Sequence, residues 1–401
     1  MKTRKPVYLD CNSTTRIHPK ALETMMPFLK EDYGNSSSLH KKGSSARAAL
    51  ESARAVIGDA LGTEGVDIIF TSGGTESDNL AIKGICQKNR GRGKHIITSS
   101  IEHMAVLEAC RFVQAQDFDI TYLPVDRYGM VDPLDVKKAV NDHTILVSIM
   151  HANNEVGTIQ PIREISEIIR EINENRETSV DNRKPSACKR IYIHTDAVQT
   201  FGKIPIDVDA LGVDLLSMSA HKLYGPKGIG ALYIRKSTQI SSFMHGGHQE
   251  RDLRAGTVNV AGVVGFAKAV EISRANFKDK KRQECLRDKL YRGLLRSIKG
   301  IILNGHPDNG LYNTLNLCFE GVNSTSLIAS LDLKGIFVSA GSACIASSPE
   351  PSHVLKAMHV PEEYIKSCVR FSMGADNTDE DITYCVQEIP EIINRLRRTH
   401  S

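Results

Sequence analysis

The sequence predicts an α/β protein in which a large domain, with a mostly parallel sheet flanked by helices, is joined to a smaller α+β domain. Three observations support this fold class. Short β-branched runs alternate with longer amphipathic runs over the first three quarters of the chain. After residue 300 the alternation changes to a mixture of strands and helices. The chain of 401 residues also exceeds the roughly 250–300 residues at which one hydrophobic core stops growing.

Six apolar runs in the first part of the chain predict strands. β-branched residues dominate these runs, and their length is typical of buried strands. Segments with helical spacing follow the first two runs, at residues 76–87 and 105–114. Strands that are separated by helices in this way form parallel sheets covered on both faces. The predicted strands lie at residues 67–71, 95–98, 144–149, 191–194, 214–218 and 229–234.

The remaining segments complete two domains. Residues 173–189 are polar and aperiodic, which predicts a surface loop. A helical stretch rich in Lys and Arg is expected over residues 260–299, with its charges on a solvated face. Beyond it we expect strands at 314–319 and 336–339 and helices at 352–358 and 379–396. We therefore predict a large domain over residues 15–260 and a small domain formed by residues 1–14 and 261–401.

The composition excludes several classes of protein. Lys and Arg number 51 and Asp and Glu number 47, which gives a formal net charge of +4. A nearly neutral chain with 5% aromatic residues and no Trp does not favour nucleic-acid binding. No apolar run approaches the ~18 residues of a membrane span. Asp10 interrupts the apolar stretch Val7–Leu9, so no secretory signal is expected. We expect a cytoplasmic protein with no nucleic-acid or membrane partner.

Nine cysteines are present, and no pair has the C-x-x-C spacing. Without a secretory signal we expect reduced thiols rather than disulfides, and the missing paired spacing argues against a structural zinc site. His245 and His248 flank two glycines but lack further ligands. We expect a structural or substrate-loop role for these histidines and no resident metal.

The segment Ser72–Ser77 (Ser-Gly-Gly-Thr-Glu-Ser) directly follows a predicted strand and precedes a predicted helix. Glycines leave backbone N–H groups accessible there, and the start of a helix favours an anion, so a phosphate is the natural ligand. The motif is neither a Walker loop nor a dinucleotide fingerprint. Taken alone, it also fits an ordinary strand–helix turn that carries two glycines.

Two further motifs lie at the ends of later strands. Asp196 sits at the C-terminal end of an apolar strand, the end at which open α/β sheets place their ligands. Taken alone, it would serve either as a helix cap or as the partner of a protonated ring nitrogen.

Ser219, His221 and Lys222 cluster before a Gly-Pro turn. A lysine at a strand end in an apolar sheet is expected to have a lowered pKa and a nucleophilic amine, although an isolated lysine in a turn would be an ordinary surface residue. A phosphate cradle, an aspartate at a strand end and this cluster, in that order on one sheet, are what pyridoxal 5′-phosphate (PLP) requires.

Five more motifs extend along almost the whole chain. They are Tyr8–Asp10 with Asn12–Thr15, Gly34–Ser38, Asn153–Gly157, Arg254–Thr257 and Arg370–Gly374. With these motifs the chain resembles the NifS/IscS-like cysteine desulfurases of the aminotransferase class-V family. The resemblance implies PLP fold type I, with a seven-stranded sheet in the large domain. Cys11 departs from it, because the family more often has another residue there.

The resemblance also implies roles at the ring of the cofactor. Lys222 would bond covalently to PLP, and Asp196 would pair with the pyridinium nitrogen. His103 would stack over the ring and is a candidate proton donor. Gln199 would bond the phenolate oxygen, with Asn154 beside it and near the carboxylate of the substrate.

The phosphate and the substrate would be held by other residues of the same pattern. Arg370 would clamp the carboxylate of the substrate. Thr257 of a second subunit would reach the phosphate, which implies a homodimer with shared sites. Within one subunit the phosphate would be held by Gly74, Thr75, Ser219 and His221.

Cys344 lies in Ser339–Glu350, where small residues followed by proline predict an exposed and flexible loop. A thiol in such a loop has the access and freedom that a nucleophile requires. The resemblance assigns Cys344 as the catalytic cysteine of the small domain and as a candidate transient ligand of an iron–sulfur cluster. Ile345 and Pro349 differ from the residues that are common in relatives, but neither change removes the thiol.

The implied activity is PLP-dependent removal of sulfur from L-cysteine, which gives L-alanine and a persulfide on Cys344. An iron–sulfur scaffold or another sulfur-acceptor protein would receive this sulfur. A selenocysteine lyase is the alternative, because it needs the same PLP site and a similar thiol loop. A class-V aminotransferase, another PLP lyase or a silent scaffold fits less well, because none explains both Cys344 and a complete Lys222 site.

Overall fold

A seven-stranded sheet forms the centre of the larger domain in the computed structural model, which describes residues 5–178, 190–242, 244–340 and 351–399. All neighbouring strands are parallel except β8, which runs antiparallel to both β2 and β7. The predicted fold class is therefore confirmed. In spatial order the strands are β2 (Ile68–Thr71), β8 (Gly230–Ile234), β7 (Leu215–Ser219), β6 (Tyr192–Asp196), β5 (Thr144–Ser148), β3 (His95–Ser99) and β4 (Asp119–Leu123).

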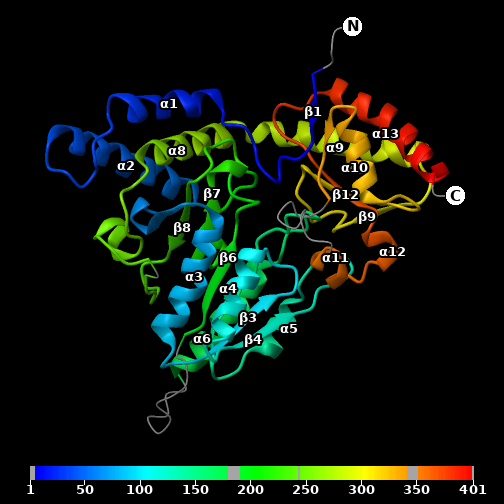
Figure 1. Cartoon of the computed structure of the whole chain (residues 1–401). Helices are drawn as coiled ribbons and strands as arrows, with labels where there is room; N and C mark the ends of the chain where they lie inside the picture. The colour runs from blue at the N-terminus through cyan, green and yellow to red at the C-terminus, as the bar shows by residue number, and fades with distance from the viewer. Residues whose placement is uncertain (1–4, 179–189, 243, 341–350, 400–401) are drawn as a thin grey trace.

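Helices cover both faces of this sheet (Figure 1). Successive side chains of a strand point to opposite faces. Ile69 and Leu215 accordingly belong to the core beneath α3 (Gly74–Asn89) and α4 (Met104–Gln114), whereas Phe70 and Leu216 belong to the opposite core. The helices that contribute to this second core include α2 (Lys41–Ala60), α5 (Pro133–Ala139), α6 (Ile162–Thr178) and α7 (Val208–Leu211).

Two long helices extend the larger core. α1 (Pro19–Lys30) and α8 (Val260–Ala275) lie against each other, and α2 packs on α8, at the upper left of Figure 1. α8 inserts Val263 and Phe266 into the core that α2 shares with the sheet. A Cβ atom on Gly265 would lie 2.6 Å from Met25 Sδ, so the Met25 side chain of α1 packs directly on the glycine of α8.

A second hydrophobic core lies at the other end of the molecule, where β1 and α13 bring the two ends of the chain together (Figure 1). Its antiparallel sheet has the order β12 (Cys368–Ser372), β10 (Thr314–Phe319), β9 (Ile301–Asn304), and β1 (Val7–Tyr8) pairs in parallel with β11 (Ile336–Phe337). The helices of this core are α9 (Lys280–Ser297), α10 (Ser324–Asp332) and α13 (Asp379–Thr399). The buried residues of α11 (His353–Ala357) and α12 (Glu362–Ile365) belong to the larger core instead.

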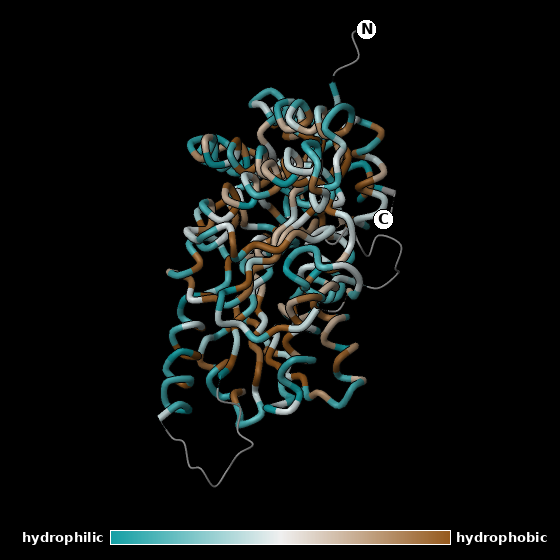
Figure 2. The backbone as a smooth tube through the Cα atoms, turned by 90° about the vertical axis from the view of Figure 1, so that its left-hand side faces the viewer, coloured by the Kyte–Doolittle hydropathy of each residue, from teal (hydrophilic) through white to brown (hydrophobic). Residues whose placement is uncertain are grey.

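Hydrophobic residues concentrate in the strands at the centre of the molecule, and the outer helices carry many hydrophilic residues (Figure 2). Over the described ranges, no helix is both long enough and apolar enough to span a bilayer.

Four features differ from the sequence-based expectation. Residues 173–178, which were expected to belong to a surface loop, form the end of α6, because their polar side chains suit the exposed face of an amphipathic helix. The helical stretch expected over residues 260–299 is broken, because a 3-10 turn at Phe277–Asp279 separates α8 from α9. β4 was not expected. It is an edge strand, and only its last residue, Leu123, is buried, so it lacks the apolar run by which the other strands are recognised. β9 was also not expected, since it is short and only half-buried apart from Asn304.

The expectation of reduced thiols is wrong for one pair of cysteines. Cys318 of β10 and Cys368 of β12 face each other in the antiparallel register and are joined by a disulfide. Their separation by 50 residues explains why no spacing motif revealed the pair. Cys188 and Cys344 lie outside the described residues. The free cysteines among the described residues are Cys11, Cys86, Cys110 and Cys385, which are buried, and Cys285, which is exposed.

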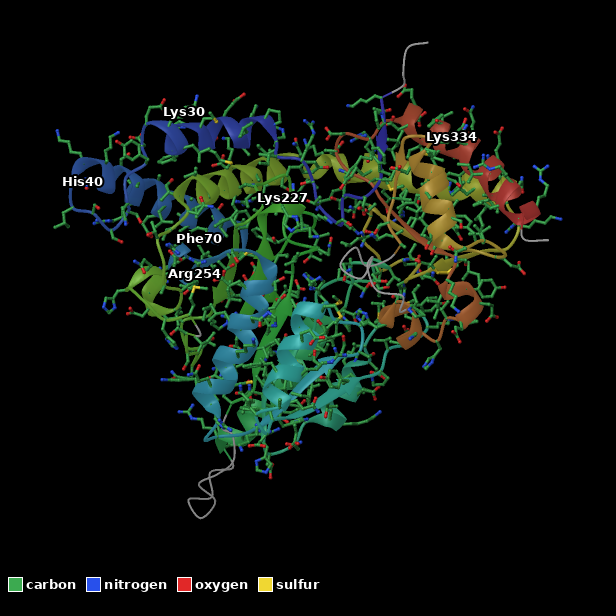
Figure 3. The ribbon with its side chains drawn as sticks, viewed as in Figure 1. Lys30, His40, Phe70, Lys227, Arg254 and Lys334 are labelled. Atoms are coloured by element: carbon green, nitrogen blue, oxygen red, sulfur yellow. A yellow bond between two sulfur atoms is a disulfide. The ribbon has the colours of Figure 1, made fainter. Side chains whose placement is uncertain are left out.

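A buried ion pair holds the segment after β8 against the edge strand β2. Arg54 of α2 binds both carboxylate oxygens of Glu250, at 2.8 and 2.7 Å, and Glu250 Oε2 also accepts the N–H of Phe70. The guanidinium lies 4.8 Å from the centre of the Phe70 ring. Glu250, Arg251 and Asp252 all have positive φ, a conformation that costs free energy and persists only where surrounding contacts impose it. Figure 3 labels Phe70 and, nearby, Arg254 of the same segment.

Glu250→Gln is expected to lower the free energy of unfolding by about 3–5 kcal/mol, because it leaves the buried Arg54 without its counter-charge. Glu51→Gln is the matched control. Glu51 contacts the same guanidinium at 3.3 Å, but its side chain is 58% exposed against 2% for Glu250, so the loss should stay below about 1 kcal/mol. Denaturant unfolding measures both values. Equal losses would contradict the role of burial.

Candidate active site

A cavity of about 200 Å³ opens where the parallel strands of the large sheet end. Its walls come from segments that follow β2, β3, β5, β6 and β7, together with the N-terminal segment and β12. Ligands bind at this edge in open α/β sheets. Ten of the sequence-predicted residues line it: Gly74, Thr75, His103, Asn154, Asp196, Gln199, Ser219, His221, Lys222 and Arg370. Thr257 does not line this cavity, and Cys344 lies outside the described residues.

The start of α3 provides an anion site at one end of the cavity. Gly73 precedes the helix, with φ 156° and ψ −178°, a backbone region that is essentially restricted to glycine. No side chain caps this helix terminus, so its N–H groups favour a ligand anion. A Cβ atom on Gly73 would lie 3.8 Å from Ser219 Oγ, which places that hydroxyl beside the same terminus.

Lys222 stands at the middle of the cavity wall. β7 ends at Ser219, and a 3-10 turn over Ala220–Lys222 carries the lysine into the cavity. Lys222 Nζ donates to the backbone carbonyls of Asn12, at 2.7 Å, and Ser13, at 2.6 Å. The amine is thus held by uncharged acceptors of the N-terminal segment.

Asp196, the last residue of β6, supplies a buried carboxylate. Its Oδ1 accepts the N–H of Val198 at 2.9 Å. Burial raises the pKa of Asp196, while His103, the Val198 N–H and Lys222 favour its charged form. A buried carboxylate of this kind is strongly stabilised by a cationic partner inside the cavity.

A second buried carboxyl group lines the same cavity as Asp196. Asp78, on the second turn of α3, lines the cavity, and its pKa is raised well above the usual value by burial and by Asp196. Its Oδ1 has no hydrogen-bond partner among the described residues and lies 3.6 Å from His194 Nε2. Burial lowers the pKa of His194 to about 3, so this histidine is neutral and binds Ser148 and Ser217.

The two predicted site histidines have different environments. His103 caps α4, and its Nδ1 accepts the N–H of Ala105 at 3.1 Å. A proton on His103 therefore resides on Nε2. Burial and the charges of Lys222 and Lys227 lower the pKa of His221 to about 4. His221 therefore offers a hydrogen bond, but no positive charge, at neutral pH.

Arg370 lies on the central residue of β12 and is 1% exposed. Its guanidinium donates to Asn154 O, to Ser13 Oγ and to Asp10 Oδ1, the last at 2.9 Å. Its Nε finds no partner among the described residues. A guanidinium fixed at the wall of the cavity suits a carboxylate ligand.

The segment that carries Thr257 is connected to the anion site indirectly. Arg254 pairs with Glu76 of α3 at 2.8 Å, and Glu76 Oε2 accepts the N–H of Ser72 at 2.8 Å. Thr257 itself is exposed.

Several lining residues were not predicted as site residues. Asn12 and Ser13 lie in a motif that supported the resemblance, and that motif was the available signal for them. Asp78 follows Gly74 by four residues, one helical turn, and this spacing would have placed it on the cavity side of α3. The described residues contain no group of three or more His, Cys, Asp or Glu side chains suited to a metal ion.

Comparison with known proteins gives a family for this geometry. Residues 7–385 match the family described as aminotransferase class-V. The chain belongs to the aminotransferase class-V family. Within this family it is a relative of the NifS/IscS-like cysteine desulfurases, so the resemblance seen in the motifs is confirmed.

Relatives and solved structures of this family match almost the whole chain. Cysteine desulfurase IscS of Dictyoglomus turgidum is 51% identical, over 98% of this chain and 96% of its own length. Cysteine desulfurase IscS of Methanosarcina thermophila is 50% identical, over 98% of this chain and 93% of its own length. Among solved structures, a NifS-like protein superposes with a TM-score of 0.88 at 39% identity, covering 98% of this chain and 100% of that chain. The structure titled SspA in complex with cysteine superposes with a TM-score of 0.78 at 36% identity, covering 92% and 98%.

Glu102→Gln is expected to change how stability depends on pH. Burial and the charge of Asp196 raise the pKa of Glu102 to about 8, although Ser99 and the Met150 N–H bind its carboxyl group. An unfolded glutamate titrates near ~4.3, so the folded state holds one more proton between about pH 5 and 8. The free energy of unfolding of the wild-type protein therefore falls by about 1.4 kcal/mol per pH unit as the pH rises through that window.

The glutamine variant cannot ionise and should lose this slope. Unfolding of both proteins in denaturant at pH 5, 6 and 7 measures the difference. Glu108→Gln on the exposed face of α4, where the side chain is 57% exposed, should keep the wild-type slope. Parallel curves for wild type and Glu102→Gln would refute the raised pKa.

Proposed function

We propose that this protein is a PLP-dependent cysteine desulfurase that converts L-cysteine to L-alanine and places the sulfur on Cys344 as a persulfide. One observation carries the proposal: a single cavity unites the α3 terminus, Asp196 and Lys222. The printed names of its relatives, cysteine desulfurase IscS, and the cysteine complex of a structural neighbour support the same activity.

The residues of the cavity fit PLP. A phosphate suits the uncapped terminus of α3. Gly74 keeps space open at this terminus, because a Cβ atom there would lie only 2.6 Å from Val198 Cγ2. A protonated pyridine nitrogen suits the buried Asp196. An aldehyde suits the amine of Lys222, which uncharged carbonyl groups hold. When bound, PLP supplies a ring that stabilises negative charge on the Cα atom of the substrate.

The side chains of this protein would then move protons and hold the substrate. Lys222 would take the proton from Cα as a general base, and His103 would return a proton from Nε2. Arg370 would bind the carboxylate of L-cysteine, with Asn154 beside it. Asp196 would keep its negative charge opposite the ring nitrogen.

Cys344 would attack the sulfur of the substrate as a thiolate. A sulfur–sulfur bond forms and the Cβ–S bond breaks, so the sulfur leaves with Cys344 and the carbon skeleton departs as alanine. Ser339 pairs with the backbone of Arg370 in both directions, at 3.2 and 2.7 Å. Cys344 follows Ser339 by only five residues in the sequence.

The wider roles of the protein belong to the same proposal. Thr257 would complete the phosphate site of a second subunit in a homodimer, which agrees with its exposed position outside the cavity of its own chain. An iron–sulfur scaffold or another acceptor would receive the persulfide sulfur in the cytoplasm. Selenocysteine lyase remains the second candidate, and relative rates with L-cysteine and L-selenocysteine distinguish the two.

The central test compares alanine and sulfide release from L-cysteine, in the presence of a thiol reductant, by wild type and two variants. Lys222→Ala should abolish both products, since it removes the base and the covalent attachment. Cys344→Ala should still bind L-cysteine and change the absorbance of the bound cofactor, but release almost no sulfide. Cys285→Ala is the control, because Cys285 is the exposed free cysteine among the described residues. Wild-type desulfuration by Cys344→Ala would overturn the persulfide assignment.

Arg370→Lys should raise KM for L-cysteine by roughly 10- to 100-fold, because a lysine keeps the charge but loses the planar fork that binds a carboxylate. Steady-state kinetics at saturating PLP measures this change. Arg274→Lys is the control, since Arg274 forms an exposed surface pair with Asp59. An unchanged KM in Arg370→Lys would exclude the carboxylate role.

A further inference from the structure

Lys203 is a second buried lysine beside Lys222. It follows β6 by seven residues, is 7% exposed, and lines a smaller cavity of about 160 Å³ that also touches Lys222. Its amine donates to two neutral amide groups, and it forms no ion pair with a carboxylate of the described residues. An ammonium group buried without a counter-charge is unfavourable for stability, so its position requires another explanation.

Lys203 determines which way two amide side chains face. Its Nζ donates to Gln199 Oε1 and to Asn12 Oδ1, both at 2.9 Å. A charged lysine has only donors, so both amide oxygens must face it. The amide NH₂ groups therefore point away: Gln199 Nε2 donates to the Asn12 carbonyl at 3.0 Å, and Asn12 Nδ2 donates to Thr314 Oγ1 at 2.8 Å.

This orientation reaches the cavity of the active site. Gln199 and Asn12 both line that cavity, and one N–H of Gln199 remains for a ligand there. The carbonyl of Asn12 that accepts from Gln199 also accepts from Lys222 at 2.7 Å. Lys203 is thus separated from the amine of Lys222 by a single residue.

Burial and the neighbouring cations lower the pKa of Lys203. Burial, followed by the charge of Lys222, lowers the pKa of Lys203 to about 7; Arg370 lowers it further and Cys11 opposes the change. The interaction is mutual, so a proton on Lys203 disfavours one on Lys222. Other ionisable groups that line the smaller cavity are Arg16, His18, Tyr224, Asp279, Lys280, Tyr312 and Asp376. Of these, Arg16 and Asp376 pair with each other, and Asp279 pairs with Arg282.

We propose that Lys203 is a positioning residue of the active site, which fixes the Gln199 amide so that its N–H, rather than its oxygen, faces the hydroxyl oxygen of PLP beside Lys222. This inference rests on the proposed PLP site. A donor facing that oxygen favours its ionised form, and a cation near Lys222 favours the unprotonated nitrogen. Both effects keep the PLP–lysine linkage unprotonated at neutral pH.

The test is a pH titration of the absorbance of the PLP-loaded protein without substrate. Lys203→Met has similar length but no donor, so it frees the Gln199 amide to turn and removes the nearby charge. The midpoint of the absorbance change should rise by about one pH unit. Lys203→Arg keeps donors and charge and should restore most of the wild-type midpoint.

Lys280→Met is the matched control. Lys280 lines the same smaller cavity, and burial lowers its pKa to about 8. Its amine lies 3.7 Å from the centre of the Phe277 ring, whereas the amine of Lys203 binds two amide oxygens. The midpoint of the absorbance titration of Lys280→Met should equal that of wild type. Gln199→Glu removes the N–H donor without changing Lys203 and should also raise the midpoint.

A double-mutant cycle makes the inference specific. If Lys203 acts through Gln199, the shifts of Lys203→Met and Gln199→Glu are not additive in the double variant. A wild-type midpoint in Lys203→Met, or full additivity in the cycle, would overturn the inference. Should Lys203→Met not fold, Lys203→Gln takes its place with the same expected shift. If wild type itself binds no PLP, the proposed function fails; if wild type binds PLP and only the shift is missing, the failure concerns Lys203 alone.

Discussion

The backbone of Asn12 joins the two hydrophobic cores to the site. Its carbonyl accepts from Lys222 and Gln199, its N–H donates to Ser372 Oγ of β12 at 3.0 Å, and its side chain donates to Thr314 of β10. The lysine at the end of the large sheet is therefore held by a residue that the small sheet positions. A shift of one core relative to the other reaches Lys222 through one residue, so the site is complete only when both parts are packed together.

The acidic and the cationic side chains at the cavity come from different segments of the chain. The carboxyl groups gather behind β6 and α3, and burial raises their pKa values. The cationic side chains contact the N-terminal segment, where carbonyl and amide oxygens hold Lys203 and Lys222, and Asp10 and Ser13 hold Arg370. The histidines His194 and His221 stay neutral, with pKa values lowered to about 3 and 4, and add no charge. A ligand with a cationic ring nitrogen and a separate carboxylate meets a complementary charge in each group.

The sequence was informative where a residue type and its position in a strand together indicate chemistry. Asp196 and Lys222 follow apolar strands, and parallel strands bring their ends to one edge, so the meeting of these residues was predictable. The spacing from Gly74 indicates the face of α3 on which Asp78 lies, but the burial of Asp78 and Lys203 was not predictable, because a charged residue in a helix or turn is exposed by default and only tertiary packing reveals its burial. The same limit applies to Cys318 and Cys368, whose pairing depends on the register of two strands that are distant in sequence.

The described residues on either side of Cys344 are attached to the walls of the cavity. On the N-terminal side, Ser339 pairs with the backbone of Arg370. On the C-terminal side, Ser352 Oγ donates to Glu155 Oε2 at 2.7 Å. His353 Nε2 lies 2.9 Å from the carbonyl oxygen of Glu102, the residue before His103. The residues that flank positions 341–350 in the sequence are thus bonded to Arg370 of the cavity and to the neighbours of Asn154 and His103, which agrees with the role proposed for Cys344.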